Sequence, residues 1–308
     1  MINEHPVRPA IVVGVDGSES ALHATRWAAR EAELRKLPLR LVHACDPPMI
    51  SHPTTVAGQG QYISALRDQG RHWVREAVAA AGSVAPTVPV TDVVRVGGAA
   101  RVMVEESAGA RLTVLGSRGL GGFPELLAGS VAKAVAKYGH SPVVVVRGRK
   151  PEDPPPSGGP VLVGVDGSPA SEAAVEFAFD IASFEGSELI ALHCWSEVSF
   201  DTVWTMLAFE ADWHAVADEE HRLLDERMAG WQEKYPDVPV HRLVVRDRPV
   251  RALLKAAEGS GAQLIVVGTR GLGDELTGMG VGSTSLALLH QSECPVAVVR
   301  PTSKGDNR

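Results

Sequence analysis

Short apolar runs alternate with longer stretches of helical periodicity along the whole chain. Residues 10–15 form a compact run rich in Val and Ile, which is typical of a strand buried on both faces. The same pattern predicts further strands at 39–44, 91–96, 111–116, 142–147, 188–193, 240–246, 263–268 and 295–300. Helices are predicted at 19–35, 62–81, 99–109, 169–185, 208–234 and 249–259, and after Ser130 and Ser283. This alternation indicates an α/β fold with parallel sheets and right-handed crossovers.

The chain repeats itself after about 150 residues. "IVVGVDGSESA" at 11–21 returns as "VLVGVDGSPAS" at 161–171, and "LTVLGSRGLGG" at 112–122 returns as "LIVVGTRGLGD" at 264–274. "LRLVHAC" and "SPVVVVR" also return, in the same order, as "LIALHCW" and "CPVAVVR". A stretch rich in proline and glycine separates the copies and is typical of an exposed linker. We therefore predict two domains, 1–148 and 160–308, joined by a linker at 149–159.

Composition narrows the class of protein. The 308 residues carry a net charge of −7 and only 5% aromatic residues, which argues against nucleic acid or an anionic membrane as the main partner. The three cysteines are widely spaced and fit neither a disulfide framework nor a metal site. The sequence shows neither a secretory signal nor an apolar run long enough for a membrane span. We expect a soluble cytoplasmic protein.

The segment "GSRGLGGFPELLAGS" at 116–130 is the candidate ligand-binding segment. Glycine lets a ligand approach the backbone closely, and a helix that begins at Ser130 offers free N–H groups to an anion. Small residues at both ends of the loop would let two pieces of backbone close on one phosphate chain. In open α/β sheets such ligands bind beyond the carboxyl ends of the strands. The competing interpretation is a tight turn followed by a helix cap.

The motif is neither a Walker loop, which needs a lysine, nor a dinucleotide fingerprint, which follows a first strand. Gly116 and Gly119, followed after nine residues by Gly129 and Ser130, resemble the ATP-binding signature of universal stress proteins. The segments "VGVDGS" and "SPVVVVR" resemble the same family, and the likeness covers both halves. The chain thus resembles a tandem member of the actinobacterial type. The resemblance implies two doubly wound domains, each a five-stranded parallel sheet with helices on both faces.

The resemblance also implies an ATP, with or without Mg²⁺, between the end of the first strand and the glycine loop. Asp16 would lie under the nucleotide, Val42 would touch adenine, and the glycine loop would line the ribose and phosphates. In the first domain the implied binding residues are Gly14, Asp16, Val42, Gly116, Ser117, Arg118, Gly119, Gly129, Ser130 and Val131. In the second they are Gly164, Asp166, Leu192, Gly268, Thr269, Arg270, Gly271, Gly282, Ser283 and Thr284.

The second copy departs from this pattern in its loop. Ten residues separate Gly271 from Gly282, where the first copy has nine. Asp274 and Glu275 also replace Gly122 and Phe123, which puts two carboxylates near the expected phosphates. Because like charges repel, we expect the first site to bind a triphosphate better than the second.

Several of these residues also have structural interpretations. Ser18 and Ser168 are suited to cap helices, which would leave Asp16 and Asp166 for a ribose hydroxyl, an adenine amino group or a metal. His43 and His193 are expected to pack near the site without acting in it. Arg118 and Arg270 would meet phosphate or remain solvated. We expect Cys45 and Cys294 to be packed core residues.

The function expected from these features is that of a regulatory nucleotide-binding protein of the stress response, with at most weak ATPase activity. The alternatives are a slow ATP hydrolase or phosphotransferase and a nucleotide-free interaction module. ATP, AMP and a cyclic nucleotide each offer an adenine and a phosphate, so the residues leave this choice open. The apolar last strands suggest edge pairing. The resemblance implies that the two halves pair through these strands and that two chains pair again to form a homodimer. The sequence does not identify the regulatory protein partners.

Overall fold

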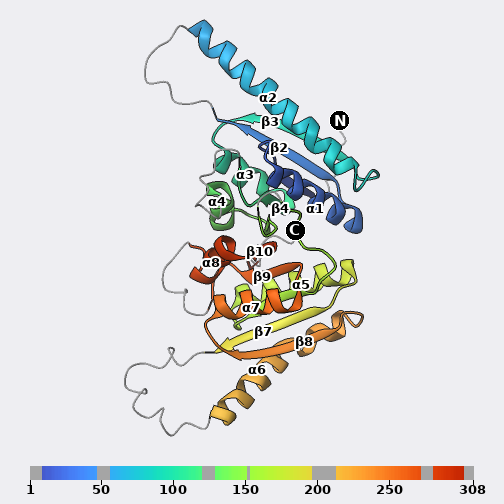
Figure 1. Cartoon of the computed structure of the whole chain (residues 1–308), viewed down its shortest axis with the longest axis vertical. Coiled ribbons are helices and arrows are strands. Elements are labelled where there is room, and N and C mark those ends of the chain that lie inside the picture. The colour runs from blue at the N-terminus through green and yellow to red at the C-terminus, as the bar shows by residue number, and fades with distance from the viewer. Residues whose placement is uncertain are drawn as a thin grey trace, which may run out of the picture. The chain divides into compact units, whose positions relative to one another are not determined.

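The computed structural model describes residues 9–46, 56–119, 129–150, 153–195, 213–271 and 280–301. It contains two compact units, Met1–Pro155 and Pro156–Arg308. Both are α/β units in which strands and helices alternate along the chain (Figure 1). The predicted fold class is confirmed in each unit.

The elements of the first unit follow the predicted ranges closely. Helix α2 is the main difference, since it begins several residues before the predicted start at residue 62. The elements are β1 (Ala10–Gly14), α1 (Glu19–Arg35), β2 (Leu39–Cys45), α2 (Val56–Gly82), β3 (Val90–Val96), α3 (Ala99–Ser107), β4 (Ala110–Gly116), α4 (Ser130–Tyr138) and β5 (Val143–Val146).

The second unit repeats this order. Helix α6 is described from Trp213, so the first predicted residues of that helix, 208–212, lie outside the described residues. The elements are β6 (Val161–Val165), α5 (Pro169–Glu185), β7 (Leu189–Trp195), α6 (Trp213–Lys234), β8 (Val240–Arg246), α7 (Pro249–Ser260), β9 (Leu264–Gly268), α8 (Ser283–Gln291) and β10 (Val296–Val299).

Each unit has a parallel sheet whose strand order reverses at its first strand. In the first unit the order is β3-β2-β1-β4-β5, and in the second it is β8-β7-β6-β9-β10. The strands β5 and β10 are buried at every residue, as expected for strands covered on both faces. The reversal places β1 beside β4 in the first unit and β6 beside β9 in the second. In each unit the carboxyl ends of the two strands flank a crevice. Ligands of open α/β sheets bind at this kind of switch point.

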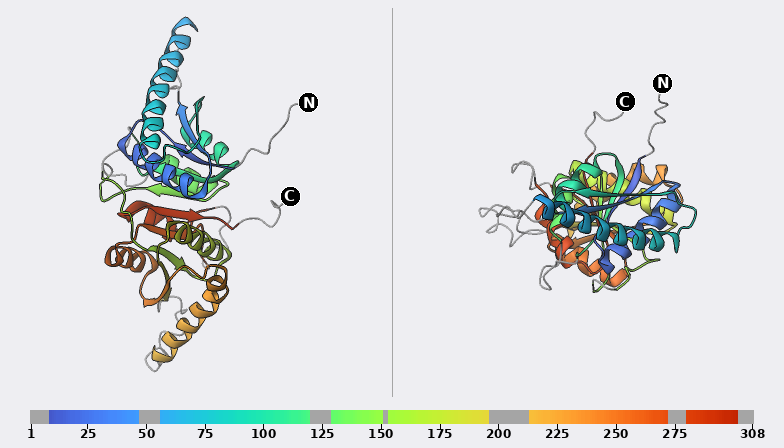
Figure 2. Two further views of the ribbon diagram at one scale, coloured as in Figure 1. Left: turned by 90° about the vertical axis from the view of Figure 1, so that its right-hand side faces the viewer. Right: turned by 90° about the horizontal axis from the view of Figure 1, so that it is seen from above.

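Helices cover both faces of each sheet. In the first unit α1 packs with α2 on one face and α3 packs with α4 on the other (Figure 1). The second unit pairs α7 with α8 in the same way. Residues 60–69 of α2 include no buried residue, and this part of the helix runs past its sheet (Figure 2). Among the described helices, none combines the length and hydropathy that crossing a bilayer requires.

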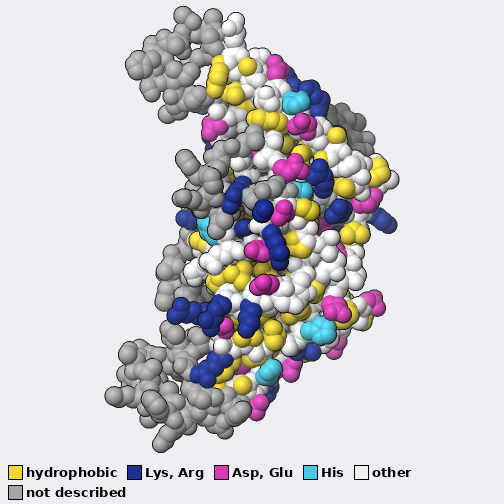
Figure 3. Space-filling model, viewed as in Figure 1, with side chains coloured by type: hydrophobic (Ala, Val, Ile, Leu, Met, Phe, Trp, Pro, Cys, Tyr) yellow, Lys and Arg dark blue, Asp and Glu magenta, His cyan; other side chains and the backbone are white. Residues whose placement is uncertain are grey.

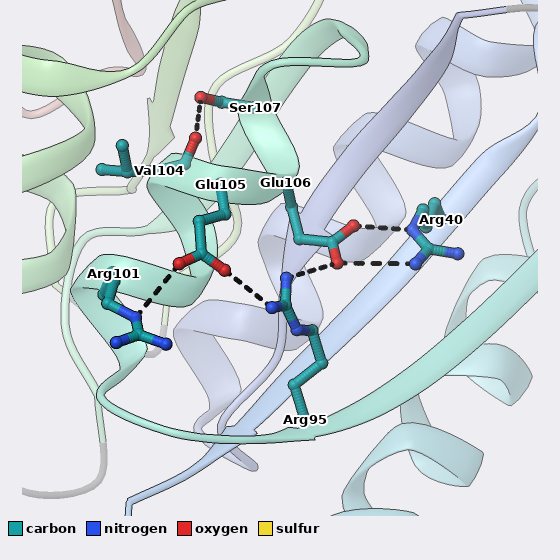
Figure 4. Close-up of polar contacts among 7 residues, drawn as sticks. All are labelled: Arg40, Arg95, Arg101, Val104, Glu105, Glu106 and Ser107. Atoms are coloured by element: carbon teal, nitrogen blue, oxygen red, sulfur yellow. Dashed lines mark hydrogen bonds and ion pairs between the residues drawn. The ribbon is translucent and has the colours of Figure 1, made fainter.

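A charge network ties α3 to the neighbouring strands of the first unit (Figure 4). Glu106 accepts hydrogen bonds from Arg40 Nε at 2.8 Å and from Arg95 Nη1 at 3.1 Å. Arg95 Nη2 also donates to Glu105 at 2.6 Å, and Arg101 Nε lies 3.0 Å from the same carboxylate. Only 11% of the Glu106 side chain is exposed, so this carboxylate depends on its arginine partners. The second domain has Ile190, Val245 and Ala256 at the corresponding sequence positions, so the network is specific to the first.

Candidate nucleotide-binding site

The turn after the first strand of each unit is built by an Asp-Gly-Ser segment. Gly17 and Gly167 have φ values of +86° and +80°, which glycine adopts without strain. Asp16 Oδ1 accepts a hydrogen bond from the Ser18 amide at 3.0 Å, and Asp166 Oδ1 accepts one from the Ser168 amide at 2.9 Å. One carboxylate oxygen of each aspartate is thus engaged in the turn.

The serines of this segment cap the following helices, as the sequence predicts. Ser18 Oγ accepts from the Ala21 amide at 3.2 Å, and Ser168 Oγ accepts from the Ser171 amide at 3.1 Å. Pro169 occupies the first turn of α5, where its missing N–H is harmless. The helices therefore begin with their own caps, and the aspartates are not needed for that role.

The second carboxylate oxygen of each aspartate faces the glycine loop. A Cβ built on Gly271 would stand 2.6 Å from Asp166 Oδ2, and one built on Gly119 would overlap Asp16 Oδ2. Real Cβ atoms do not make such contacts, so any larger residue at these two positions would have to displace the aspartate carboxylate. The second glycine of the motif therefore lets the loop lie against the aspartate from the first strand.

Gly116 and Gly268 serve a different purpose. A Cβ on Gly116 would lie 2.8 Å from the backbone carbon of Ser20, and one on Gly268 would lie 2.7 Å from that of Ala170. These glycines allow β4 and β9 to approach the first turns of α1 and α5. Ser20 Oγ also accepts a hydrogen bond from the Ser117 amide at 2.9 Å. For these two glycines close packing alone is a sufficient reason for the absence of a side chain.

The far end of the loop is fixed at the amino termini of α4 and α8. The Gly129 amide donates to the Ser117 carbonyl at 2.9 Å, and the Gly282 amide donates to the Thr269 carbonyl at 2.6 Å. Neither helix has a side-chain hydrogen bond at its cap. The first-turn N–H groups that begin at Ser130 and Ser283 are thus available to an anion.

A cavity of about 400 Å³ lies at this edge of the second unit. Nine of the ten residues predicted for the second site line it, and these are Gly164, Asp166, Leu192, Gly268, Arg270, Gly271, Gly282, Ser283 and Thr284. The exception is Thr269, which is buried and borders a separate hollow. The motif positions, far apart in sequence, thus meet around one space of a size that holds small ligands.

The cavity also has lining residues that the sequence reasoning missed. They are Val165, Ser171, Cys194, Pro249, Leu253, Val267 and Ser285. The internal repeat could have pointed to one of them, Leu253, which occupies the same repeat position as Met103. In the structure Leu253 packs near Gly164 as Met103 packs near Gly14. The apolar members come from strand ends and α7. The cavity therefore combines apolar walls with the hydrogen-bond donors of the loop and of the first turn of α8.

The charged groups of the cavity are few. Asp166 and Arg270 line it, and Arg270 Nε donates to the Gly280 carbonyl at 3.1 Å. Burial, with a smaller contribution from the negative charge of Asp247, raises the pKa of Cys194 to about 12. The described residues hold no cluster of three or more His, Cys, Asp or Glu side chains suited to a metal. A cation in this cavity would therefore need ligands in addition to the Asp166 carboxylate.

One histidine on β2 and one on β7, His43 and His193, hold the backbone just before the aspartate turns. The Nδ1 atoms of His43 and His193 lie 2.7 Å from the carbonyl oxygens of Val15 and Val165. A carbonyl only accepts, so Nδ1 carries the proton in each ring. These carbonyls immediately precede Asp16 and Asp166. The histidines therefore hold the turn in place, and the cavity's lining residues do not include His193.

The remaining predicted residues of the first site occupy equivalent places in the first unit. The Val42 carbonyl accepts from the Val15 amide at 2.8 Å, in the middle of β2, where Val42 pairs with the last residue of β1, Gly14. Arg118 and Val131 are half-buried beside Gly119 and Ser130. Cys45 and Cys294 are buried, as predicted. Gly122, Phe123, Asp274 and Glu275 lie outside the described residues, as do the whole of the nine-residue loop, 120–128, and residues 272–279 of the ten-residue loop.

Comparison with known proteins gives consistent matches over the whole chain. The model of the "Universal stress protein family" matches residues 8–147 and again 159–300. The universal stress protein Rv2623 of Mycobacterium tuberculosis is 41% identical over 295 residues, which cover 94% of this chain and 96% of that protein. A universal stress protein of Mycolicibacterium smegmatis is 39% identical over 298 residues, with coverages of 94% and 97%.

The fold also matches solved structures. A universal stress protein from Archaeoglobus fulgidus superposes with a TM-score of 0.69 at 20% identity, covering 97% of both chains. At that identity the likeness concerns the fold alone.

Proposed function

This chain belongs to the universal stress protein family, and on that premise we propose that each of its domains binds ATP as a regulatory ligand. The observation that carries the proposal is the cavity of the second unit, around which nine predicted residues meet. Its volume of about 400 Å³ falls in the range of small-molecule sites. The first domain repeats the same turn, glycine contact and helix terminus.

The lining of the cavity suits both ends of a nucleotide. Leu192, Val165 and Leu253 offer apolar surface for an adenine ring. The first turn of α8 presents free N–H groups and the positive end of its dipole to phosphate. Arg270 adds a positive charge to the lining. Asp166 Oδ2, which lies against Gly271, is placed to accept a hydrogen bond from a ribose hydroxyl.

A regulatory role is favoured over hydrolysis by the titratable groups that line the cavity. Among the described lining residues these are Asp166, Cys194 and Arg270. The arginine stays protonated, and the Cys194 thiol stays protonated near neutral pH because its pKa is about 12. Asp166 has one oxygen engaged in the turn. ATP that binds one conformation better than another would change the surface that the protein offers to partners.

Equilibrium titration of ATP with magnesium, compared with AMP and a cyclic nucleotide, tests this proposal. Asp166→Asn is the informative variant, because the amide oxygen can still accept from Ser168 while the charge is lost. A tenfold or greater loss of affinity at the second site would indicate direct contact with the ligand. If Asp16→Asn and Asp166→Asn left the nucleotide affinity unchanged, both aspartates would have only a structural role in the turn. Steady multiple turnover of ATP would move the assignment to the hydrolase alternative.

A further inference from the structure

The turn that carries Asp166 packs against a side chain of α6. A Cβ built on Gly167 would overlap the guanidinium group of Arg227 and would lie 2.7 Å from its Nε, so this group lies directly against the glycine backbone. Gly167 immediately follows Asp166, which lines the nucleotide cavity, whereas Arg227 is not among the described lining residues. Arg227 therefore lies one layer behind the wall of the cavity.

Arg227 belongs to the face of α6 that packs against the rest of its unit. Glu220, Leu224 and Arg227 follow one another at intervals of four and three residues, which places them on one side of the helix. Leu224 and Met228 are fully buried, and Arg227 is half-buried beside them. The Nη1 atom of Arg227 is itself buried and has no hydrogen-bond partner among the described residues. The guanidinium is thus a positive charge that is partly removed from water.

The first domain fills the equivalent place with an uncharged group. A Cβ built on Gly17 would overlap the indole ring of Trp73 on α2, so this ring packs against the turn that carries Asp16. At the repeat position of Arg227 the first domain has Ala77. The corresponding glycine of the two turns is therefore covered by a neutral ring in the first domain and by a guanidinium in the second.

The side chains behind the two turns therefore differ in charge. Asp16 and Asp166 each carry a carboxylate, which repels the phosphate groups of a nucleotide. Behind the second turn, His193 Nε2 lies 2.8 Å from Glu220 Oε2, and this ion pair adds no net charge. The guanidinium thus adds a positive charge to the turn of the second domain, which the indole ring does not add to the turn of the first.

A positive charge at this place acts on the cavity more strongly than one on the surface. Lys and Arg side chains gather on the left of the second unit in Figure 3, although the chain as a whole is acidic. Salt screens exposed charges of this kind beyond about 10 Å at 0.1 M. The guanidinium of Arg227 is partly buried and packs against the residue next to Asp166, so its attraction for an anion in the cavity is screened less.

We propose that Arg227 is a positioning residue that sets the ligand preference of the second domain. Its charge, held behind the turn at Gly167, makes the cavity favour charged adenine nucleotides over uncharged adenosine. The inference rests on the proposed function, because it concerns the ligand of the same cavity. Arg227 acts from behind the turn and not as a contact of the ligand, so its effect depends on its charge more than on its shape.

Titration of the full chain with ATP and magnesium, with AMP and with adenosine, at constant ionic strength, tests this role. The backbone amide resonances of Gly282 and Thr284 report the affinity of the second cavity. Arg227→Met removes the charge and keeps most of the side-chain length, whereas Arg227→Lys keeps the charge; Arg227→Gln replaces the methionine variant if that one does not fold. Arg222→Met is the matched control, since Arg222 is an exposed arginine of the same helix paired with Glu219.

We expect Arg227→Met to weaken the binding of ATP and AMP about fivefold and that of adenosine less than about twofold, and we expect Arg227→Lys and Arg222→Met to bind all three nearly as the native chain does. An equal loss for the three ligands that lysine does not restore would reduce Arg227 to a structural role and overturn the inference. Native ATP affinity in Arg227→Met would overturn it as well. Either result would leave the proposed function standing, whereas a native second cavity that binds no adenine nucleotide would overturn both.

Discussion

The carboxylate of Asp166 lies directly against Gly271, so closely that a Cβ on Gly271 would stand 2.6 Å from Oδ2. Asp16 and Gly119 make the same contact in the first domain, where the space is tighter still. Neither glycine has a positive φ. The requirement for glycine is therefore steric and comes from the aspartate across the crevice.

Alanine at either glycine should displace the aspartate and weaken nucleotide binding at that domain only. We expect Gly271→Ala to raise the dissociation constant of the second site about tenfold, and Gly119→Ala to have at least as large an effect on the first. Gly230→Ala is the control, because Gly230 lies in α6 with open space around a Cβ. It should leave binding unchanged and stabilise the chain by about 0.5–1 kcal/mol. Titration calorimetry and urea unfolding measure the two quantities.

Much of this arrangement could be predicted from the sequence. Buried strands of Val and Ile, Ser-Pro at a helix start and the internal repeat identified nearly every element, because each is a local signal. The repeat also identified the residues that surround the cavity. What local signals could not supply was the geometry between distant segments.

Three residues illustrate that gap. Thr269 belongs to the motif, yet it is buried and borders the smaller hollow at the start of α5, not the main cavity. Cys194 lines the cavity although no binding role was predicted for it, since it lies near the end of β7, which pairs with β6. Gly116 was predicted to contact ligand, and the structure adds a steric reason for its glycine, the close approach of α1, that the sequence did not show.

Cys194 provides a chemical probe of the second cavity. Since burial and Asp247 raise its pKa to about 12, the thiolate fraction is very small at pH 8. We expect alkylation of Cys194 to accelerate about tenfold per pH unit between pH 8 and 10, because only the thiolate reacts. Bound ATP should slow the reaction further by covering the thiol. Peptide mapping after iodoacetamide treatment separates Cys194 from Cys45 and Cys294.

Cys194→Ala is the control for this experiment. It copies Ala44 of the first domain, so nucleotide affinity should be retained. Fast alkylation at pH 7 that ATP does not affect would place the thiol outside the cavity.

Glu106 should make the stability of the first domain dependent on pH. Burial alone would raise its pKa, but the hydrogen bonds and charges of Arg40 and Arg95 outweigh burial and hold the pKa below its usual value. A carboxylate with a lowered folded pKa stabilises the fold above its unfolded pKa, and this contribution is lost as the pH falls through the folded pKa. Glu106→Gln should therefore reduce the free energy of unfolding by about 1–2 kcal/mol at pH 7.

The difference between Glu106→Gln and the native chain should shrink as the pH falls from about 4.5, where the unfolded chain takes up the proton first, and should vanish once the pH is below the lower folded pKa, where both states carry it. Glu105→Gln, at a more exposed carboxylate of the same network, should have an effect of at most about 0.5 kcal/mol. Urea unfolding at several pH values measures both. Equal effects of the two variants would contradict the role given to Glu106.

The histidines behind the two sites should both carry a proton on Nδ1 but differ in the partner of Nε2, which in His193 must also carry a proton to donate to the Glu220 carboxylate. His193 Nε2 lies 2.8 Å from Glu220 Oε2, whereas the His43 ring meets the edge of Trp73 with centroids 5.2 Å apart. Nitrogen-15 NMR should show the proton on Nδ1 in both rings. Glu220→Ala should destabilise the second domain by about 1 kcal/mol through the lost hydrogen bond. A proton on Nε2 alone in either ring would contradict the hydrogen bond from Nδ1 to the carbonyl of Val15 or Val165.

The central claim is that both domains hold an adenine nucleotide, and native mass spectrometry tests it most directly. The native chain, Gly119→Ala and Gly271→Ala would be measured as purified and again after addition of ATP with magnesium, with denaturation to identify what is released. The account predicts two ATP molecules per native chain and the loss of one in each variant. A native chain that carries no adenine nucleotide as purified, and binds none when ATP is added, would contradict it.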